Sequence, residues 1–265
     1  MKKRYQYLML ALLTVLVLIV IYTGDKKTRA EQIEFQKIAI EYNNAQEERR
    51  LKIEELEQAI KSDIPGIVAY GDSLTAGAGG DGVTYSGVLQ DLIGDSIYKI
   101  PVVNRDVGGE GNVEIANTSE FNNYIPIVFI GENGGYVDNE DLINQINTIL
   151  NMDKLNDKFI VLGLTSGTSA SRLDLEQAME SAFGDRYINL RDYIVQNGFK
   201  QSKLVATNED LAAIKDGSVP PSLLVDASQL NAYGYTIIGN AIYERMNKLG
   251  YFENILKNLA ELKAL

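Results

Sequence analysis

The chain contains no cysteine and no histidine among its 265 residues. The absence of cysteine excludes disulfides, thiolate metal sites and a cysteine nucleophile. Histidine is the commonest metal ligand and the only side chain that titrates near neutral pH when it is unperturbed. An enzyme made from this sequence therefore has to use another base for proton transfer. The sequence indicates no metal and no other cofactor.

Basic residues are also scarce beyond the N-terminus. The net charge is −11, and residues 1–30 hold six of the 25 Lys and Arg but one acid, Asp25, which leaves 19 basic against 35 acidic residues in the rest. A surface of that sign repels phosphate backbones, so nucleic acid is not an expected partner. The acidic excess is otherwise typical of a soluble surface.

Apolar side chains dominate the start of the chain. No charged residue occurs between Tyr5 and Gly24, and Leu8–Tyr22 is almost continuously apolar. Twenty helical residues span about 30 Å, which matches the hydrocarbon thickness of a bilayer. We therefore predict a transmembrane anchor over residues 1–25. A cleaved signal peptide is the alternative, but Ile21–Asp25 lacks the small-x-small pattern of a cleavage site.

The charges that flank this segment bear on its orientation. Residues 2–4 read Lys-Lys-Arg, and cytoplasmic flanks carry an excess of such residues. Three further basic residues between positions 26 and 29 oppose this bias. We expect a single-pass protein of the cell membrane with its N-terminus inside and its domain outside.

Residues 26–63 are predicted to form a helical stalk. They are rich in Glu, Gln, Lys and Arg, and two apolar runs, Phe35–Ala45 and Ile53–Ile60, follow heptad-like spacing. The two runs are out of register, and Arg49 and Lys52 fall where apolar residues belong. We therefore expect weak self-association through the stalk at most. The breakers in Asp63-Ile64-Pro65-Gly66 end the helix.

Residues 64–255 are expected to form one α/β domain, followed by a C-terminal helical tail over residues 256–265. Short apolar runs predict strands, and segments with helical spacing between them predict helices; alternation of this kind indicates a three-layer sandwich with a mostly parallel sheet. The expected strands are Ile67–Tyr70, Pro101–Val107, Ile125–Ile130, Phe159–Leu164 and Tyr187–Leu190. The expected helices are Tyr85–Ile93, Asp141–Leu150, Leu173–Phe183 and Ala232–Leu249.

Polar residues follow these strands where ligands of parallel sheets bind, beyond the carboxyl ends. The first strand leads into Gly71-Asp72-Ser73-Leu74, a serine placed like a nucleophile between a strand and a helix. Asp and Ser are also favoured helix caps, so a simple capping turn is the alternative. The second strand leads into Gly108-Gly109, and the third into Gly131-Glu132-Asn133. Gly163–Ser169 closes the fourth and forms either a pocket rim or a polar loop without a ligand role.

The first three of these segments, together with Asp226–Tyr235, resemble the four ordered blocks of the SGNH/GDSL hydrolases, a family of esterases and lipases. The resemblance spans about residues 66–250 and implies a flavodoxin-like sheet. It implies Ser73 as the nucleophile and an oxyanion hole formed by the Ser73 N–H, the Gly109 N–H and the Asn133 side chain. The substrates it implies are acyl esters of glycans or lipids.

The last block departs from the family's pattern. Asp226 is kept, but Gln229 occupies the position of the catalytic histidine. A neutral amide imitates the geometry, since it can donate to Asp226 and accept from Ser73, but it is no base at pH 7. Several outcomes stay open: a hydrolase scaffold with strongly impaired activity, an active esterase that uses Asp226 or water as base, a non-catalytic ligand-binding envelope protein, or an esterase from which histidine was removed by mutation or design.

Overall fold

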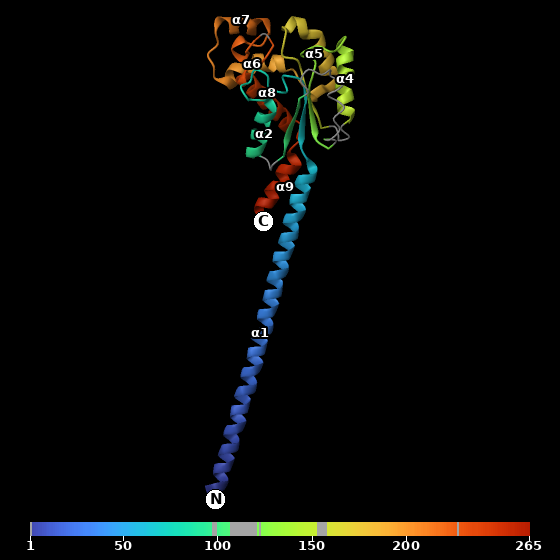
Figure 1. Cartoon of the computed structure of the whole chain (residues 1–265). Coiled ribbons are helices and arrows are strands. Elements are labelled where there is room, and N and C mark those ends of the chain that lie inside the picture. Colours follow the sequence, from blue (N-terminus) through green and yellow to red (C-terminus); the bar gives the residue numbers. More distant parts are fainter. Residues whose placement is uncertain (1, 97–99, 107–120, 122, 153–157, 227) are drawn as a thin grey trace. The chain divides into compact units, whose positions relative to one another are not determined.

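The computed structural model describes residues 2–96, 100–106, 121, 123–152, 158–226 and 228–265. It divides into two units: residues 1–55 with Leu265, and residues 56–264 (Figure 1). The first unit belongs to one long helix, α1 (Lys2–Asp63), and the second holds the sheet and the remaining helices.

Helix α1 is supported along its polar part by pairs of opposite charge one turn apart, such as Arg50 with Glu47 and Glu54 at 2.6 Å each. Within the described part of the chain, no helix combines the length and the apolar character that crossing a membrane requires. The side chains of residues 1–8 and 10, which belong to the expected anchor, lie outside that part. The anchor over residues 1–25 stays a prediction.

The second unit is built on five parallel strands. They are β1 (Ile67–Gly71), β2 (Val102–Asp106), β3 (Ile125–Phe129), β4 (Ile160–Leu162) and β5 (Tyr187–Ile188), in the order β2-β1-β3-β4-β5. Every residue of β1 and β3 is buried, as expected for strands that are covered on both faces. The predicted α/β class with a parallel sheet is confirmed, and the strand order is that of flavodoxin-like sheets.

Helices cover both faces of this sheet, which makes three layers. Helices α2 (Tyr85–Ser96) and α8 (Ala232–Lys248) lie on one face, and α4 (Asn139–Met152) and α5 (Ser169–Phe183) on the other (Figure 1). Alternate residues of β1 enter the two cores: Ile67 and Ala69 pack with α2 and α8, and Val68 and Tyr70 pack with α4 and α5. This period of two is what a strand buried on both faces imposes.

The expectations for the C-terminal half of the sheet need correction. Strand β5 ends at Ile188, and Leu190, which was expected to close it, is the first residue of α6 (Leu190–Ser202). The reason is local, because the Asn189 side chain accepts a hydrogen bond from the Asp192 N–H and caps the new helix. Strand β4 is likewise shorter than the expected Phe159–Leu164. Helix α7 (Asn208–Asp216) was also missed.

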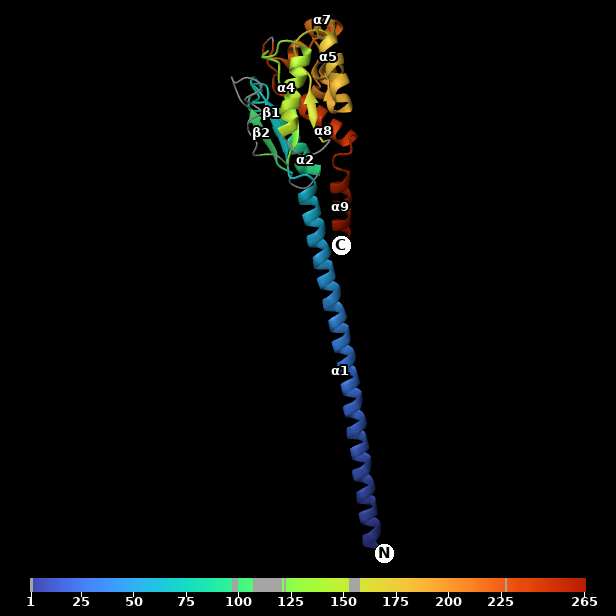
Figure 2. The same cartoon turned by 90° about the vertical axis from the view of Figure 1, so that its right-hand side faces the viewer.

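Both ends of the folded unit reach further than the sequence suggests. Leu56 and Ile60, on the last turns of α1, are 4% and 2% exposed, so the unit begins before residue 64. Helix α9 (Glu253–Ala264) starts ahead of the expected tail, and its Ile255 belongs to the same buried cluster as Ile60. Figure 2 shows α9 beside the end of α1. The last turns of α1 and the first turn of α9 thus belong to the hydrophobic core of the domain.

Candidate active site

The strand order creates a switch point between β1 and β3. The chain proceeds from β1 to β2 on one side, and then from β3 to β4 and β5 on the other. In open α/β sheets ligands bind outside the carboxyl ends of the strands at such a point. Gly71 and Phe129, the last residues of β1 and β3, are paired in register, so the segments that follow them leave the sheet side by side. Those segments carry Ser73 and Asn133.

The turn that holds Ser73 is shaped by its neighbour Asp72. One carboxylate oxygen of Asp72, Oδ1, accepts the Leu74 N–H at 3.0 Å, and the Ser73 carbonyl accepts the Ala78 N–H at 3.0 Å. Asp72 is buried and Ser73 is half-buried. A side chain at Gly71 would collide with Thr75 Oγ1 and with the Phe129 carbonyl, so this position requires glycine.

Three polar side chains hold the serine turn from behind. The Tyr85 hydroxyl lies 2.9 Å from Thr75 Oγ1, the Tyr235 hydroxyl donates to the Ala78 carbonyl at 2.8 Å, and the Asn104 amide donates to the Thr75 carbonyl at 2.8 Å. Burial raises the pKa of both tyrosines, so the hydroxyls stay protonated. These supports cannot be recognised in the sequence, because they form only once β2, α2 and α8 are packed together.

Asn133 reaches back from β3 to the serine. Its Nδ2 lies 3.3 Å from Ser73 Oγ and 2.8 Å from Asp72 Oδ2. Gly131, Gly134 and Gly135 around it have φ values of 99°, 81° and 81°, which only glycine adopts easily. Burial raises the pKa of Asp72, and the nearby Glu132 adds to the shift, although the Leu74 N–H and the Asn133 amide oppose it.

Asp226 and Gln229 lie on a loop just before α8. Asp226 Oδ1 accepts the N–H groups of Ser228 and Gln229 at 2.9 and 2.8 Å, and these bonds lower the pKa of the exposed carboxyl. Within the described residues, Asp226 Oδ2 has no hydrogen-bond partner, and the Gln229 amide contacts neither Ser73 nor Asp226.

The Asp226–Gln229 loop nevertheless abuts the serine turn. A Cβ at Gly79, in that turn, would lie 2.8 Å from the Leu230 carbonyl oxygen and 3.3 Å from Gln229 Cβ. The structure therefore brings Ser73 and Asn133 together and sets the loop with Asp226 and Gln229 beside them. Gly109, the third expected oxyanion donor, lies outside the described residues.

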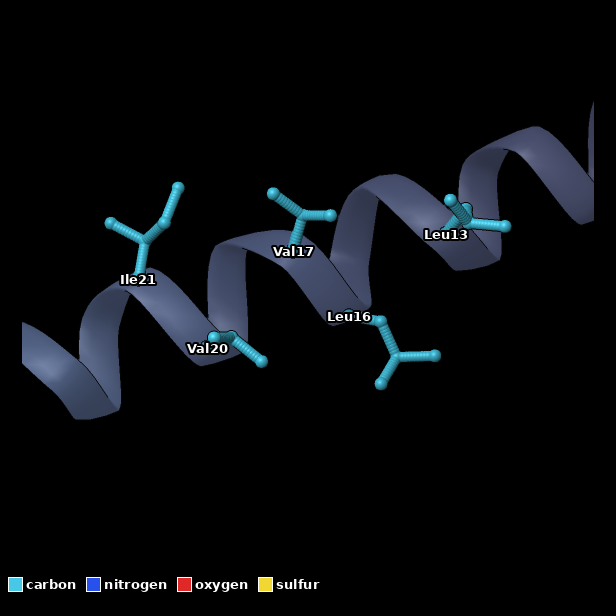
Figure 3. Close-up of a pocket in the computed structure, with 5 residues that line it drawn as sticks. All are labelled: Leu13, Leu16, Val17, Val20 and Ile21. Carbon is cyan, nitrogen blue, oxygen red and sulfur yellow. The ribbon is translucent and has the colours of Figure 1, made fainter.

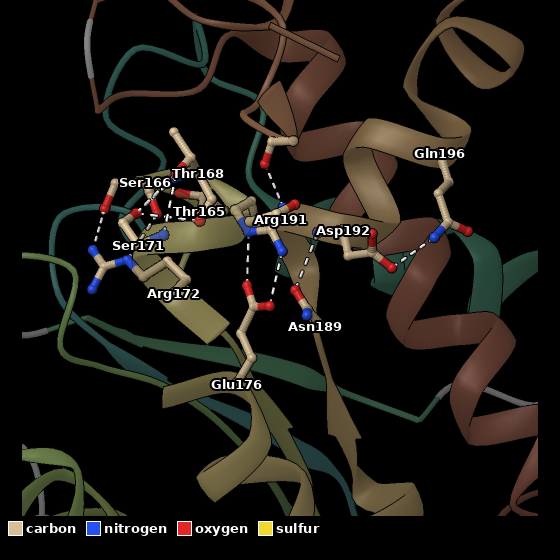
Figure 4. A network of polar contacts seen from close by, with 12 residues as sticks. Thr165, Ser166, Thr168, Ser171, Arg172, Glu176, Asn189, Arg191, Asp192 and Gln196 are labelled. Atoms are coloured by element: carbon tan, nitrogen blue, oxygen red, sulfur yellow. Dashed lines mark hydrogen bonds and ion pairs between the residues drawn. The ribbon is translucent and has the colours of Figure 1, made fainter. Parts of the chain in front are cut away.

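The loop after β4 adjoins this site through Glu132. Its carboxylate accepts the Thr165 N–H at 2.7 Å and the Ser166 N–H at 3.0 Å. Arg172 donates to the Ser166 Oγ at 2.7 Å and to the Ser166 carbonyl at 2.9 Å (Figure 4). A small cavity of 60 Å³ lies between this loop and the last block. Its lining residues are Thr165, Ser166, Gly167, Ser218, Val219, Leu224 and Ser228. Gly163–Ser169, expected as rim or plain loop, thus supplies one wall of a cavity.

Arg191 is the most deeply buried cation in this region of the described chain (Figure 4). Its guanidinium donates to both oxygens of Glu176 at 2.7 and 2.8 Å, to Ser169 Oγ at 3.1 Å and to the Gly217 carbonyl. These partners use the N–H donors of the guanidinium, so Arg191 connects α5, α6 and the end of α7. It is not placed to contact a ligand. Among the described residues no group of three metal-ligating side chains is placed to hold a metal ion.

No protein-family model matches the chain, and no curated protein matches it. Among solved structures, the chain is similar to a crystal structure of a member of the lipolytic protein G-D-S-L family from Veillonella parvula. That match has 14% sequence identity and a TM-score of 0.39, and it covers 69% of this chain and 97% of the other. Values this low establish neither a shared activity nor a shared site.

Proposed function

We propose that residues 56–264 form a serine ester hydrolase scaffold of the SGNH/GDSL type, with Ser73 as the nucleophile. The observation that carries the proposal is the 3.3 Å approach of the Asn133 amide to Ser73 Oγ at the switch point of the sheet. Acyl transfer places negative charge on the carbonyl oxygen, and an amide donor beside the nucleophile stabilises it. A capping turn alone gives no reason for an asparagine from another strand to face the serine.

The same scaffold lacks an efficient base, so we propose strongly impaired turnover. Loss of a triad histidine costs up to about 10⁶ in kcat, or roughly 8 kcal/mol of transition-state stabilisation. The oxyanion donors and binding that remain are worth about 10³–10⁴ over water. An active esterase with Asp226 as base is less well supported, because two backbone N–H groups lower the pKa of that carboxyl. A non-catalytic ligand-binding protein is the second candidate, and Gln229 is the observation that favours it.

The proposed ligand is an acyl ester of a glycan or a lipid. The small cavity of 60 Å³ beside the last block is the proposed place of a short acyl group. Four of its lining residues carry hydroxyl groups, which suits a polar ester better than a long chain. The proposed contribution of Gly109 to the oxyanion hole follows from the family resemblance alone.

We further propose that the apolar start of α1 attaches the chain to the cell membrane, with the N-terminus inside and the domain outside. Between residues 12 and 22 each large apolar side chain is at least 51% exposed. Figure 3 shows Leu13, Leu16, Val17, Val20 and Ile21 standing off the helix with no other element against them. A bilayer would cover this surface, which is costly to leave in water.

A hydrolysis assay of the full chain on a chromogenic acetyl ester tests the proposed function. We expect slow hydrolysis above the buffer rate, and a much faster rate in Gln229→His that is lost again when Ser73→Ala is added. A Gln229→His rate that Ser73→Ala leaves unchanged would show that Ser73 is not the nucleophile. Retention of acetyl-ester binding with no turnover in either chain would favour the non-catalytic ligand-binding protein.

A further inference from the structure

We infer that Asp72 is the positioning residue of the oxyanion hole, because its buried carboxylate fixes the direction in which the Asn133 amide points. The inference rests on the proposed function, in which Asn133 stabilises the oxyanion.

The two oxygens of Asp72 have separate tasks. Oδ1 accepts the Leu74 N–H at 3.0 Å and shapes the serine turn, and Oδ2 accepts from Asn133 Nδ2 at 2.8 Å. Asp72 is 7% exposed, so these donors replace water that its carboxylate has lost. A hydrogen bond to an ionised acceptor is stronger than one between neutral groups, so Asp72 dominates the orientation of the amide.

Nothing else among the described residues holds that amide. Asn133 is exposed, it precedes two glycines in the left-handed region, and its side chain bonds only to Asp72 and to Ser73. An amide nitrogen carries two hydrogens. Asp72 takes one at 2.8 Å, which leaves the second directed toward Ser73 Oγ at 3.3 Å, beside the place that the carbonyl oxygen of a bound ester would occupy.

Asp72→Asn separates this role from a purely structural one. The substitution keeps the size of the side chain, but an amide has one acceptor oxygen where the carboxylate has two. Asparagine can therefore satisfy the Leu74 N–H and keep the turn, but it then presents its own NH₂ group to the NH₂ group of Asn133. The expected result is a folded protein with a misdirected oxyanion donor.

The kinetic test is a double-mutant cycle in the full chain that carries Gln229→His. Asn133→Ala removes one oxyanion donor and should lower kcat by about 10²–10³. Asp72→Asn should lower kcat by a similar factor with little change in KM, and the two substitutions together should cost no more than either one. Multiplicative losses, or full activity in Asp72→Asn, would overturn the inference. Thermal unfolding of each variant reports whether the fold is kept.

A second measurement does not depend on activity, so it separates failure of the inference from failure of the proposed function. In the full chain labelled with ¹⁵N-asparagine, Asp72→Asn should speed solvent exchange of the Asn133 side-chain protons about tenfold or more. Asn104 is the internal control, because its amide donates to the Thr75 carbonyl at 2.8 Å in the same turn. Unchanged exchange at Asn133, or equal acceleration at both residues, would refute a positioning role.

If Asp72→Asn fails to fold, the same exchange measurement on the unsubstituted chain tests whether Asp72 holds the Asn133 amide. Solvent exchange of the Asn133 side-chain protons that is slower than that of an exposed, unbonded asparagine supports the carboxylate contact, and equally fast exchange contradicts it. If no ester is hydrolysed even with Gln229→His, the proposed function fails, while the exchange measurement still decides on Asp72.

Discussion

Asn133 Nδ2 lies 3.3 Å from Ser73 Oγ although the two residues are 60 positions apart in the chain. The contact follows from the register of β1 and β3, which pairs Gly71 with Phe129 and lets both following turns rise at the same edge. Two glycine-dependent turns then aim the side chains at each other. The approach of Asn133 to Ser73 is thus a product of sheet topology.

Asp210 should hold the segment that leads to Asp226. It is fully buried and accepts from Thr207 N–H and Oγ1 at 2.8 and 2.7 Å and from Ser222 N–H and Oγ at 2.9 and 2.8 Å. Asp210→Ala leaves these donors unsatisfied, and we expect a loss of about 2 kcal/mol in the free energy of unfolding at pH 7, measured by denaturant titration.

The pH dependence of that effect has a definite sign. Burial alone would raise the pKa of Asp210, but the hydrogen bonds from Ser222 and Thr207 outweigh it and lower the pKa from 3.8 to about 2. The stabilisation is therefore complete above pH 3.8 and is lost as the pH falls towards 2. Asp210→Asn should flatten the acid limb of the stability curve. Parallel acid limbs in Asp210→Asn and the unsubstituted chain would contradict the assignment.

Arg191 and Glu176 should behave as a buried pair. Their side chains are 3% and 15% exposed, so Arg191→Ala leaves a carboxylate without its partner in the interior. We expect a loss of about 3–5 kcal/mol. The control is Lys248→Ala, which breaks a pair with Asp185 whose side chains are 70% and 77% exposed and should cost less than about 1 kcal/mol. Equal costs for the two variants would show that burial does not set the value of the pair.

Parts of this organisation could be predicted from the sequence, and the reason is periodicity. The apolar runs of β1 and β3 are buried at every position, so their pattern predicts both the strands and the polar edge beyond them. Helix α6 was missed because its sequence LRDYIVQNGFKQS contains weak helix formers such as Gly198. Packing overrides that propensity, since a Cβ at Gly198 would lie 2.6 Å from Leu223 Cδ1.

The site, too, has residues that the sequence predicts and residues that it does not. Ser73, Asn133, Asp226 and Gln229 stand out because each lies at a fixed place in a short motif. Asp72 was given no role of its own, because its tie to Asn133 exists only once β1 and β3 are neighbours. The burial of Leu56 was also beyond the pattern, since the polar stalk composition continues through residue 63.

The proposed topology predicts that protease added to intact cells removes the domain. After the treatment, an antibody against residues 56–264 should no longer detect the domain on the cells, and a cytoplasmic marker should remain intact. The apolar run Leu8–Tyr22 and the basic cluster at residues 2–4 are the reason for this expectation. Survival of the domain while the marker is equally protected would show that the orientation is wrong.

The missing base gives the prediction that separates the candidate functions. Gln229→His should restore a relay from Ser73 through histidine to Asp226, because Asp226 Oδ2 makes no hydrogen bond with the described residues and can accept from the imidazole. Glutamine and histidine place a nitrogen at similar reach, and Gln229 is half-buried, so the larger ring should be tolerated.

The gain in ester hydrolysis should be several powers of ten in kcat, measured on the same acetyl ester in the full chain. It should vanish in the Ser73→Ala, Gln229→His double variant, because the restored base then has no nucleophile to activate. If the unsubstituted chain already hydrolyses the ester quickly and Asp226→Asn abolishes the reaction, Asp226 is the working base and impaired turnover is refuted. If neither chain hydrolyses any ester while Asn133 still faces Ser73, the site has become a binding site, which favours a non-catalytic protein built on a hydrolase fold.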